Sequence, residues 1–246
     1  MTASDNGLPP QLDLGRPTPP VGPSAVQIPA WLRPTRGEHR WPAAVAVAVV
    51  VILQLLLPQR LTFEPRWLLP AIESLLFVVL VIANPARIDR ESRVLRMLGL
   101  ALVAVVSVAT AWSAALLVGE LIDGRGWSDG VRLLKYGGVI WLTNVLTFAL
   151  WYWELDRGGP AARANARRTR PDFLFTAMTV PELVGADWEP TFIDYLYLSF
   201  TNAAAFSPTD TLPLSSWAKL SMLVQSAVSL VTFGLIVARA VNVLGA

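Results

Sequence analysis

Long apolar runs recur along this chain from residue 42 onward, and they restrict its fold more than any other feature. Five runs, at residues 42–58, 67–84, 95–121, 131–153 and 217–244, consist largely of aliphatic and aromatic side chains. A helix needs about 20 apolar residues to cross the roughly 30 Å hydrocarbon core of a bilayer. The runs therefore predict an all-α fold, a polytopic transmembrane helix bundle.

Composition agrees with this fold and excludes several functions. Hydrophobic residues make up 54% of the 246 residues and charged residues 15%, which is too apolar for an ordinary water-soluble domain. The chain has no cysteine, which excludes thiolate metal sites. Its single histidine, His39, makes a histidine-based catalytic triad improbable. The net charge of +2 is too small to indicate a nucleic-acid partner. We predict a protein that is not an enzyme and holds no cofactor or metal.

A sixth segment, residues 191–213, is apolar and aromatic but carries Asp194, Asn202 and Asp210. It is either a short fifth span, which would make six helices, or a re-entrant loop that enters and leaves on one side. Spanning is the favoured interpretation, because it places Asp194 beside Arg239 near one membrane face, where the two would form a salt bridge. In the re-entrant alternative they lie on opposite faces.

Arginines predict how the bundle is oriented. Residues 1–40 hold eight prolines and no long apolar run, so we expect a disordered, proline-rich cytoplasmic tail before a transmembrane domain at residues 41–246. Arginines are concentrated before the first run, between the second and third, and after the fourth. Positive charge in short loops stays in the cytoplasm. The N-terminus is therefore predicted inside, and six spans would put the C-terminus there too.

Polar residues within the runs are the candidate functional groups. Glu73 lies inside the second run, where an ionisable group costs several kcal/mol unless it is paired, hydrated or protonated. It belongs either to an ion or proton pathway or to a structural bond, with Lys135 of the fourth run as the expected partner. Further candidates for a polar pathway or for helix-to-helix hydrogen bonds are Ser199, Asn202, Thr209 and Asp210.

The segment 195–213 resembles the pore-loop signature of potassium channels, in which a pore helix leads to a selectivity filter and then to a long last helix. The matching positions are Ser199, Phe200, Asp210 and Pro213. Where that family has Gly-Tyr-Gly, residues 207–209 are Ser-Pro-Thr. Proline lacks an amide hydrogen and fixes φ, so this backbone cannot present the family's column of carbonyls. The resemblance does not extend to potassium selectivity.

From Trp151 to its end, the chain is more similar to an uncharacterised family of bacterial multi-pass membrane proteins. The shared features are Asp-Tyr-x-Tyr-x-Ser-Phe at 194–200, Phe-x-x-(Thr/Ser)-Asp at 206–210 and a final helix ending near Ala-x-x-Val-Asn at 238–242. That family has no established activity. The resemblance implies a fold and a place in the bacterial inner, or plasma, membrane, but no chemistry.

Two functions of different classes remain open. One is a channel-like or transporter-like protein whose polar path for a small ion runs along the fifth and last helices. The other is a structural or regulatory membrane subunit that conducts nothing. The lipid bilayer is the expected partner in both, and a homo-oligomer is open in both. A continuous water-accessible column reaching Asp194, Asn202 or Glu73 would favour the first, and a dry bundle the second.

Overall fold

The computed structural model describes residues 28–83, 88, 92–123, 130–205 and 210–244, and most of these are helical, as predicted. The longer helices are α1 (Trp41–Leu56), α2 (Leu68–Ala83), α3 (Arg93–Ile122), α4 (Gly130–Leu155), α8 (Phe192–Ala205) and α9 (Ser216–Leu244). Short helices are α5 (Pro160–Ala164), α6 (Thr176–Thr179) and α7 (Pro181–Val184), and the 3-10 turns are η1 (Ala30–Leu32), η2 (Gln59–Leu61) and η3 (Asp156–Gly158). Strands β1 (Phe173–Phe175) and β2 (Thr211–Pro213) form one antiparallel pair.

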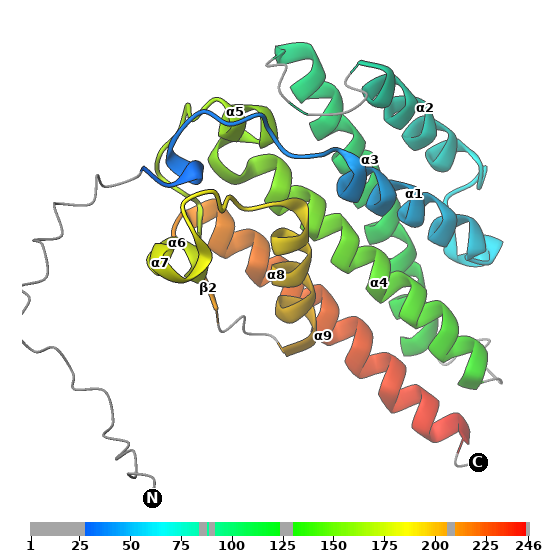
Figure 1. The fold of residues 1–246 in the computed structure, drawn as a ribbon. Helices are drawn as coiled ribbons and strands as arrows, with labels where there is room; N and C mark the ends of the chain where they lie inside the picture. Colours follow the sequence, from blue (N-terminus) through cyan, green and yellow to red (C-terminus); the bar gives the residue numbers. More distant parts are fainter. Residues whose placement is uncertain (1–27, 84–87, 89–91, 124–129, 206–209, 245–246) are drawn as a thin grey trace, which may run out of the picture.

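Helices α1 to α4 run up and down beside one another (Figure 1). Arg40, just before α1, donates to the carbonyl of Leu80 near the end of α2. The start of α3 meets the end of α4, because Gly99 leaves space for the Glu154 carboxylate. We call this end of the bundle the basic end. The described arginines at or near it are Arg33, Arg36, Arg40, Arg93, Arg96, Arg157, Arg163, Arg167, Arg168 and Arg170.

Helix α8 enters the bundle from the basic end, and the chain returns to that same end. The amide of Phe192 binds Glu38 there, so α8 begins at the basic end. After α8, β2 pairs with β1, whose first residue, Phe173, donates its amide to Asp156 at the end of α4. The favoured prediction that residues 191–213 span is therefore wrong. At about 1.5 Å per residue, the 14 residues of α8 reach only about 21 Å.

Helix α9 runs from the basic end to the opposite end of the bundle, antiparallel to α4 (Figure 1). Its first turn is at the basic end, where the indole of Trp217 donates to Asp172 over 2.8 Å. Near its other end Ile236 packs against Gly137 at the start of α4. The described part of the chain thus begins and ends at opposite ends of the bundle. The predicted shared side depended on a crossing at residues 191–213, and both ends of that segment lie at the basic end.

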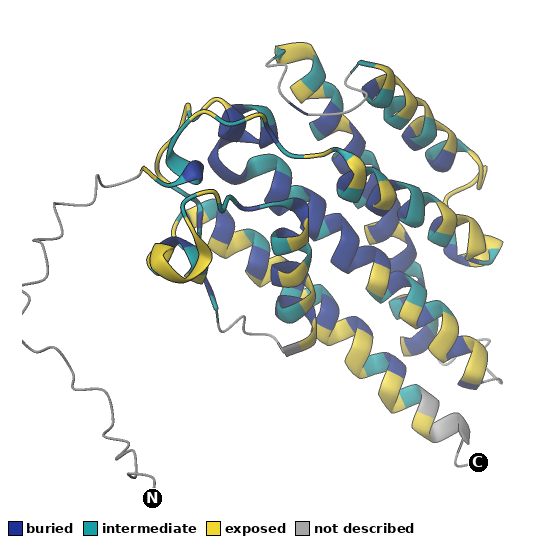
Figure 2. Ribbon diagram, in the orientation of Figure 1, coloured by how far each residue is buried: buried dark blue, intermediate teal, exposed yellow. Residues whose placement is uncertain are grey.

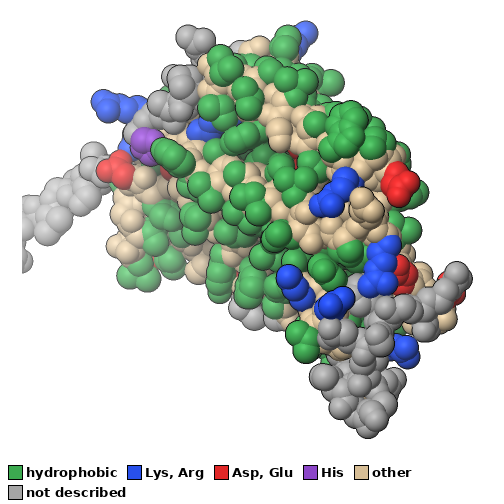
Figure 3. All heavy atoms as spheres, turned by 90° about the vertical axis from the view of Figure 1, so that its right-hand side faces the viewer, with side chains coloured by type: hydrophobic (Ala, Val, Ile, Leu, Met, Phe, Trp, Pro, Cys, Tyr) green, Lys and Arg blue, Asp and Glu red, His purple; other side chains and the backbone are tan. Residues whose placement is uncertain are grey.

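Three helical stretches are long and apolar enough to cross a membrane by length and composition: Arg93–Ile122, Gly130–Gly158 and Ser216–Arg239. Helices α1 and α2 are apolar but have 16 residues each. Exposed residues line the outer side of α9 (Figure 2), and hydrophobic side chains cover much of one face of the molecule (Figure 3). An exposed apolar surface of this extent is typical of a membrane-embedded bundle.

The segment that precedes α1 is partly built into the fold. Residues 1–27 lie outside the described residues, but from residue 28 the chain packs on the basic end. Ala30 is buried and its amide donates to the carbonyl of Ala186, and Thr35 donates its amide to Ala164. The prediction of a disordered tail is wrong for residues 28–40, because Glu38 in this stretch has buried partners that the local sequence does not reveal.

Close packing of α4 on α9 predicts that alanine substitutions at two adjacent glycines change the free energy of unfolding differently. A Cβ on Gly137 would lie 2.3 Å from Cδ1 of Ile236, whereas a Cβ on Gly138 would meet nothing within 4 Å. We expect Gly137→Ala to lower the free energy of unfolding by about 1–3 kcal/mol through overpacking. Gly138→Ala should be neutral or stabilising, since alanine favours helix. Thermal unfolding of both purified variants checks this, and equal melting temperatures would contradict the α4–α9 contact.

Candidate functional site

The candidate site is α8 together with the faces of α4 and α9 that enclose it. One face of α8 is buried, and it presents Tyr195, Leu198, Ser199 and Asn202 at helical spacing. Thr191 precedes the helix, and its amide and hydroxyl donate to the Asp194 carboxylate over 2.8 and 2.9 Å. An acidic residue at the third helical position that binds back to the N-cap is half of a capping box, so Asp194 fixes where α8 begins.

A hydrogen-bonded network centred on Gln225 of α9 joins the three helices. The Gln225 Oε1 atom accepts from the Tyr152 hydroxyl of α4 (2.6 Å) and from the Asn202 amide of α8 (2.8 Å). Its Nε2 donates to the backbone carbonyl and the hydroxyl of Ser199, at 3.0 and 2.7 Å. The Ser199 hydroxyl in turn donates to the carbonyl of Val145 over 2.6 Å. Every amide atom of Gln225 is therefore used in holding α8.

Buried polar side chains continue from this network towards the opposite end of the bundle. Asn144 of α4 donates to the Ser229 hydroxyl of α9 over 3.1 Å. The hydroxyls of Thr110 and Thr147 lie 3.3 Å apart between α3 and α4. Thr143 and Thr232 are also buried on the facing helices. We call the series from Tyr152 and Gln225 to these residues the polar row.

Glu38 accepts hydrogen bonds from three elements at the basic end. Its Oε1 accepts from the Trp153 indole at the end of α4 and from Arg163 of α5, the latter over 3.2 Å. Its Oε2 accepts from the amide of Phe192, the first residue of α8, over 2.9 Å. Burial raises the pKa of the Glu38 carboxyl, while the Arg163 charge and these hydrogen bonds act in the opposite direction. Glu38 thus links the N-terminal segment to the start of α8.

Asp156 binds α8 and the strand that follows α5. Its Oδ2 accepts from the Tyr195 hydroxyl over 2.6 Å. Its Oδ1 accepts from the amides of Asp172 (2.9 Å) and Phe173 (3.4 Å). Asp172 extends the contact to α9 through its bond from the Trp217 indole. The single carboxylate of Asp156 therefore positions both α8 and β1 relative to α4.

A tight reversal after α4 brings Arg163 close to Glu38 and Asp156, and we call these three residues the charged cluster. Arg157 and Gly159 have φ of 53° and 98°, and a Cβ on Gly159 would lie 2.9 Å from the carbonyl oxygen of Glu154, so glycine is required there. Arg163 then donates to the carbonyls of Trp153 (2.6 Å) and Asp156 (3.1 Å). Its guanidinium also lies 5.0 Å from the centre of the Tyr195 ring.

The structure brings only some of the predicted site residues together. Ser199 and Asn202 meet at Gln225, and Asn202 is only 2% exposed. Asp210 lies at the basic end, where its carbonyl accepts from the Thr176 hydroxyl over 2.6 Å and its buried Oδ1 has no hydrogen-bond partner among the described residues. Thr209 lies outside the described residues.

The structure does not bring together either of the two predicted ion pairs, Asp194 with Arg239 and Glu73 with Lys135. Asp194 caps α8 at the basic end, whereas Arg239 lies one turn beyond Ile236, which packs at the opposite end of the bundle. Glu73 is fully buried, but its partner is Gln54 of α1 at 3.1 Å. Lys135 is exposed and lies over the Tyr136 ring. Glu73 thus bonds to α1 rather than to the predicted lysine, and its place in an ion or proton pathway stays a prediction.

Five central residues were missed by sequence reasoning: Glu38, Asp156, Arg163, Tyr195 and Gln225. A signal existed for Asp156, since residues 154–160 place three charges, two glycines and a proline directly after an apolar run. Gln225 was the only glutamine of the apolar run 217–244, and a buried amide in such a run needs a partner. Glu38 gave no signal, because it stands in a proline-rich stretch.

Comparison with protein-family models, with curated proteins and with solved structures found no match to this chain. Within the residues that the structure describes, there is no group of three or more His, Cys, Asp or Glu side chains placed to hold a metal ion. The chemistry of the site is therefore read from its geometry: carboxylates and amides that fix a short helix, and hydroxyls that follow it along the bundle.

The two tyrosines of α8 test the bond to Asp156. Tyr195→Phe removes the donor to a buried carboxylate, so we expect a loss of about 1.5–3 kcal/mol in the free energy of unfolding. Tyr197→Phe is the matched control, because that side chain is 52% exposed on the opposite face of the same helix. Thermal or denaturant unfolding distinguishes them. If both variants lose the same stability, Asp156 does not hold α8 as described.

Proposed function

We propose that this chain is a multi-pass membrane protein with a channel-like module, formed by α4, the re-entrant helix α8 and α9, through which a small ion or polar solute passes. The observation that carries the proposal is the course of α8, which enters and leaves at the basic end. Irregular backbone at membrane depth is tolerated only where protein covers it or water lines it. A helix that ends inside the bundle therefore either is covered by protein or lines a pathway, and the proposal takes the second alternative for α8.

The membrane placement rests on the helices and the arginines together. Three stretches suffice in length and composition, and the shorter apolar helices α1 and α2 complete a five-span bundle with α8 as a partial sixth helix. The arginines gather at the basic end, which the positive-inside rule assigns to the cytoplasm. In this arrangement α8 enters from the cytoplasmic side and the C-terminus is extracytoplasmic. A bacterial plasma membrane remains a proposal based on resemblance.

The polar row is the proposed path. It joins the deep face of α8 to hydroxyls and amides along α4 and α9, such as Asn144 and Ser229, in a region where an apolar core would serve packing equally well. In the described conformation these groups are buried and bond to one another, as expected of a dry bundle, so conduction requires that the row opens. Because Ser-Pro-Thr stands in place of a glycine-rich filter, conduction should not prefer potassium.

A non-conducting structural or regulatory subunit is the second candidate. The completeness of the Gln225 network favours it, because such hydrogen bonds routinely connect membrane helices. In neither case do we propose an enzyme.

Flux measurements in liposomes separate the two candidates. We expect purified protein to raise the leak of a monovalent ion (H⁺, Na⁺, K⁺ or Cl⁻) above that of protein-free vesicles, with sodium and potassium within a few-fold of each other. Ser229→Ala, which removes a hydroxyl from the polar row, should lower this flux several-fold without loss of folding. Ser221→Ala on the outer part of α9 is the control and should have no effect. Flux equal to that of empty vesicles would contradict conduction and support the second candidate.

A further inference from the structure

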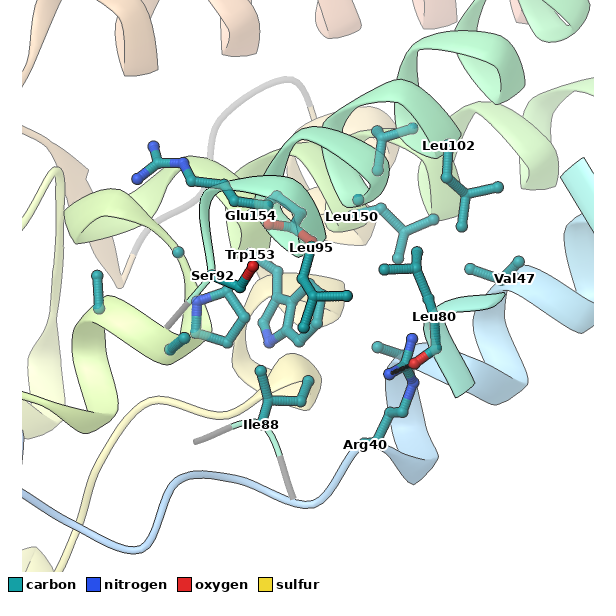
Figure 4. Close-up of a pocket in the computed structure, with 18 of the residues that line it drawn as sticks. Arg40, Val47, Leu80, Ile88, Ser92, Leu95, Leu102, Leu150, Trp153 and Glu154 are labelled. Carbon is teal, nitrogen blue, oxygen red and sulfur yellow. Dashed lines mark hydrogen bonds between the residues drawn. The ribbon is translucent and has the colours of Figure 1, made fainter. Parts of the chain in front are cut away.

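A cavity of about 280 Å³ lies at the basic end, away from the polar row, between α1, α2, α3, the end of α4 and α5 (Figure 4). An engineered cavity of about 150 Å³ in another protein holds benzene, so this one has room for a substantial apolar group. An apolar pocket of this size that opens at one end is typical of a ligand site. The cavity needs an occupant or a function.

The lining of the cavity is divided by polarity. The part further into the bundle is made of aliphatic and aromatic side chains: Val47, Phe77, Leu80, Leu102, Val103 and Leu150. The part at the basic end holds all the charged side chains of the lining, together with Ser92 and with the apolar residues Ile88, Leu95 and Trp153; the charged ones are Arg40, Arg93, Arg96 and Glu154. Figure 4 shows Val47, Leu102 and Leu150 on one side and Ser92 and Glu154 on the other. Arg93 and Arg96 are exposed, so the cavity reaches the surface at its polar part.

Positive charge exceeds negative charge at this opening. Among the described residues, three arginines line it against the one carboxylate of Glu154. A fourth arginine is close: Nη1 of Arg96 and Nε of Arg168 each lie 3.5 Å from where a Cβ on Gly158 would be, so they lie within twice that distance of each other. Two neighbouring guanidinium groups repel unless an anion lies between or beside them. Arginine forks match carboxylate and phosphate oxygens.

We propose that this cavity binds a single acyl chain with an anionic carboxylate or phosphate head group. The chain occupies the apolar part between Val47, Leu102 and Leu150, and the head group contacts Arg96 and Arg93. In the membrane placement proposed above, this orientation puts the head at the cytoplasmic surface and the tail at the depth of lipid tails. The cavity volume fits one chain rather than two.

Photo-crosslinking tests the site without reference to ion flux. A single-chain fatty acid with a diazirine near its methyl end is incubated with the protein in neutral-lipid vesicles, irradiated, and mapped by mass spectrometry. We expect saturable labelling of peptides containing Val47, Leu102 or Leu150. Competition by dodecanoate and by dodecyl phosphate supports the shared anionic chemistry, and the stronger competitor identifies the head group. Equal competition by dodecanol, or by inorganic phosphate alone, would overturn the proposal.

Variants address each half of the cavity. Leu102→Phe fills the apolar part, and Arg96→Gln removes a charge-assisted contact, so each should reduce labelling about tenfold. The controls are Val108→Phe, at a 59% exposed position of the same helix, and Arg167→Gln, an exposed arginine that does not line the cavity. Both controls should label like the unmodified protein. Labelling that is unchanged in Leu102→Phe and Arg96→Gln, with melting temperatures retained, would refute the site.

Discussion

A carboxylate buried in an apolar interior must find partners, and the rest of this structure depends on how Glu38 and Asp156 find theirs. Between them they bind the end of α4, α5, β1 and the start of α8, and Glu38 itself lies 115 residues before Trp153 in the sequence. Arg163 forms an ion pair with Glu38 and also donates to the carbonyl of Trp153 in the last turn of α4. Removing one partner from a buried ion pair costs about 3–5 kcal/mol, because the other charge is left uncompensated. The charged cluster therefore fixes where α8 enters the bundle.

The other end of α8 poses a second constraint, since a helix that stops inside an apolar bundle leaves carbonyls without partners. Side chains of α9 donate hydrogen bonds to carbonyls in this part of α8. Ser226 approaches the carbonyl of Asn202, one of the last four of α8, at 3.4 Å, and Gln225 donates one turn earlier, to the carbonyl of Ser199. The polar residues of α9 thus have a structural role whether or not anything is conducted. A path through the proposed polar row would have to use groups that already hold α8.

Apolar periodicity predicted the positions of α1 to α4 and of α9 to within a few residues, because burial and length decide those helices. It could not distinguish a span from a return at residues 191–213, since both begin with the same apolar, aromatic helix. What decides is distant: Asp156 and Glu38 hold one end, and the β1–β2 pairing draws the chain back. Ser199 and Asn202 were correctly chosen as polar contacts. Gln225 was not predicted as a contact, because the sequence of its helix does not show which residues of α4 and α8 it will face.

The central claim is that the chain enters and leaves α8 on one side and crosses the membrane once more in α9. Because the chain has no native cysteine, single cysteines at Asp187, Ser216 and Val241 test it directly with an impermeant thiol reagent on intact cells. Asp187 and Ser216 flank α8, and Val241 lies near the end of α9; all three positions are exposed. Our account predicts that cysteines at Asp187 and Ser216 are both protected, while a cysteine at Val241 is labelled. Labelling at Ser216 together with protection at Val241 would contradict the account and restore a spanning segment.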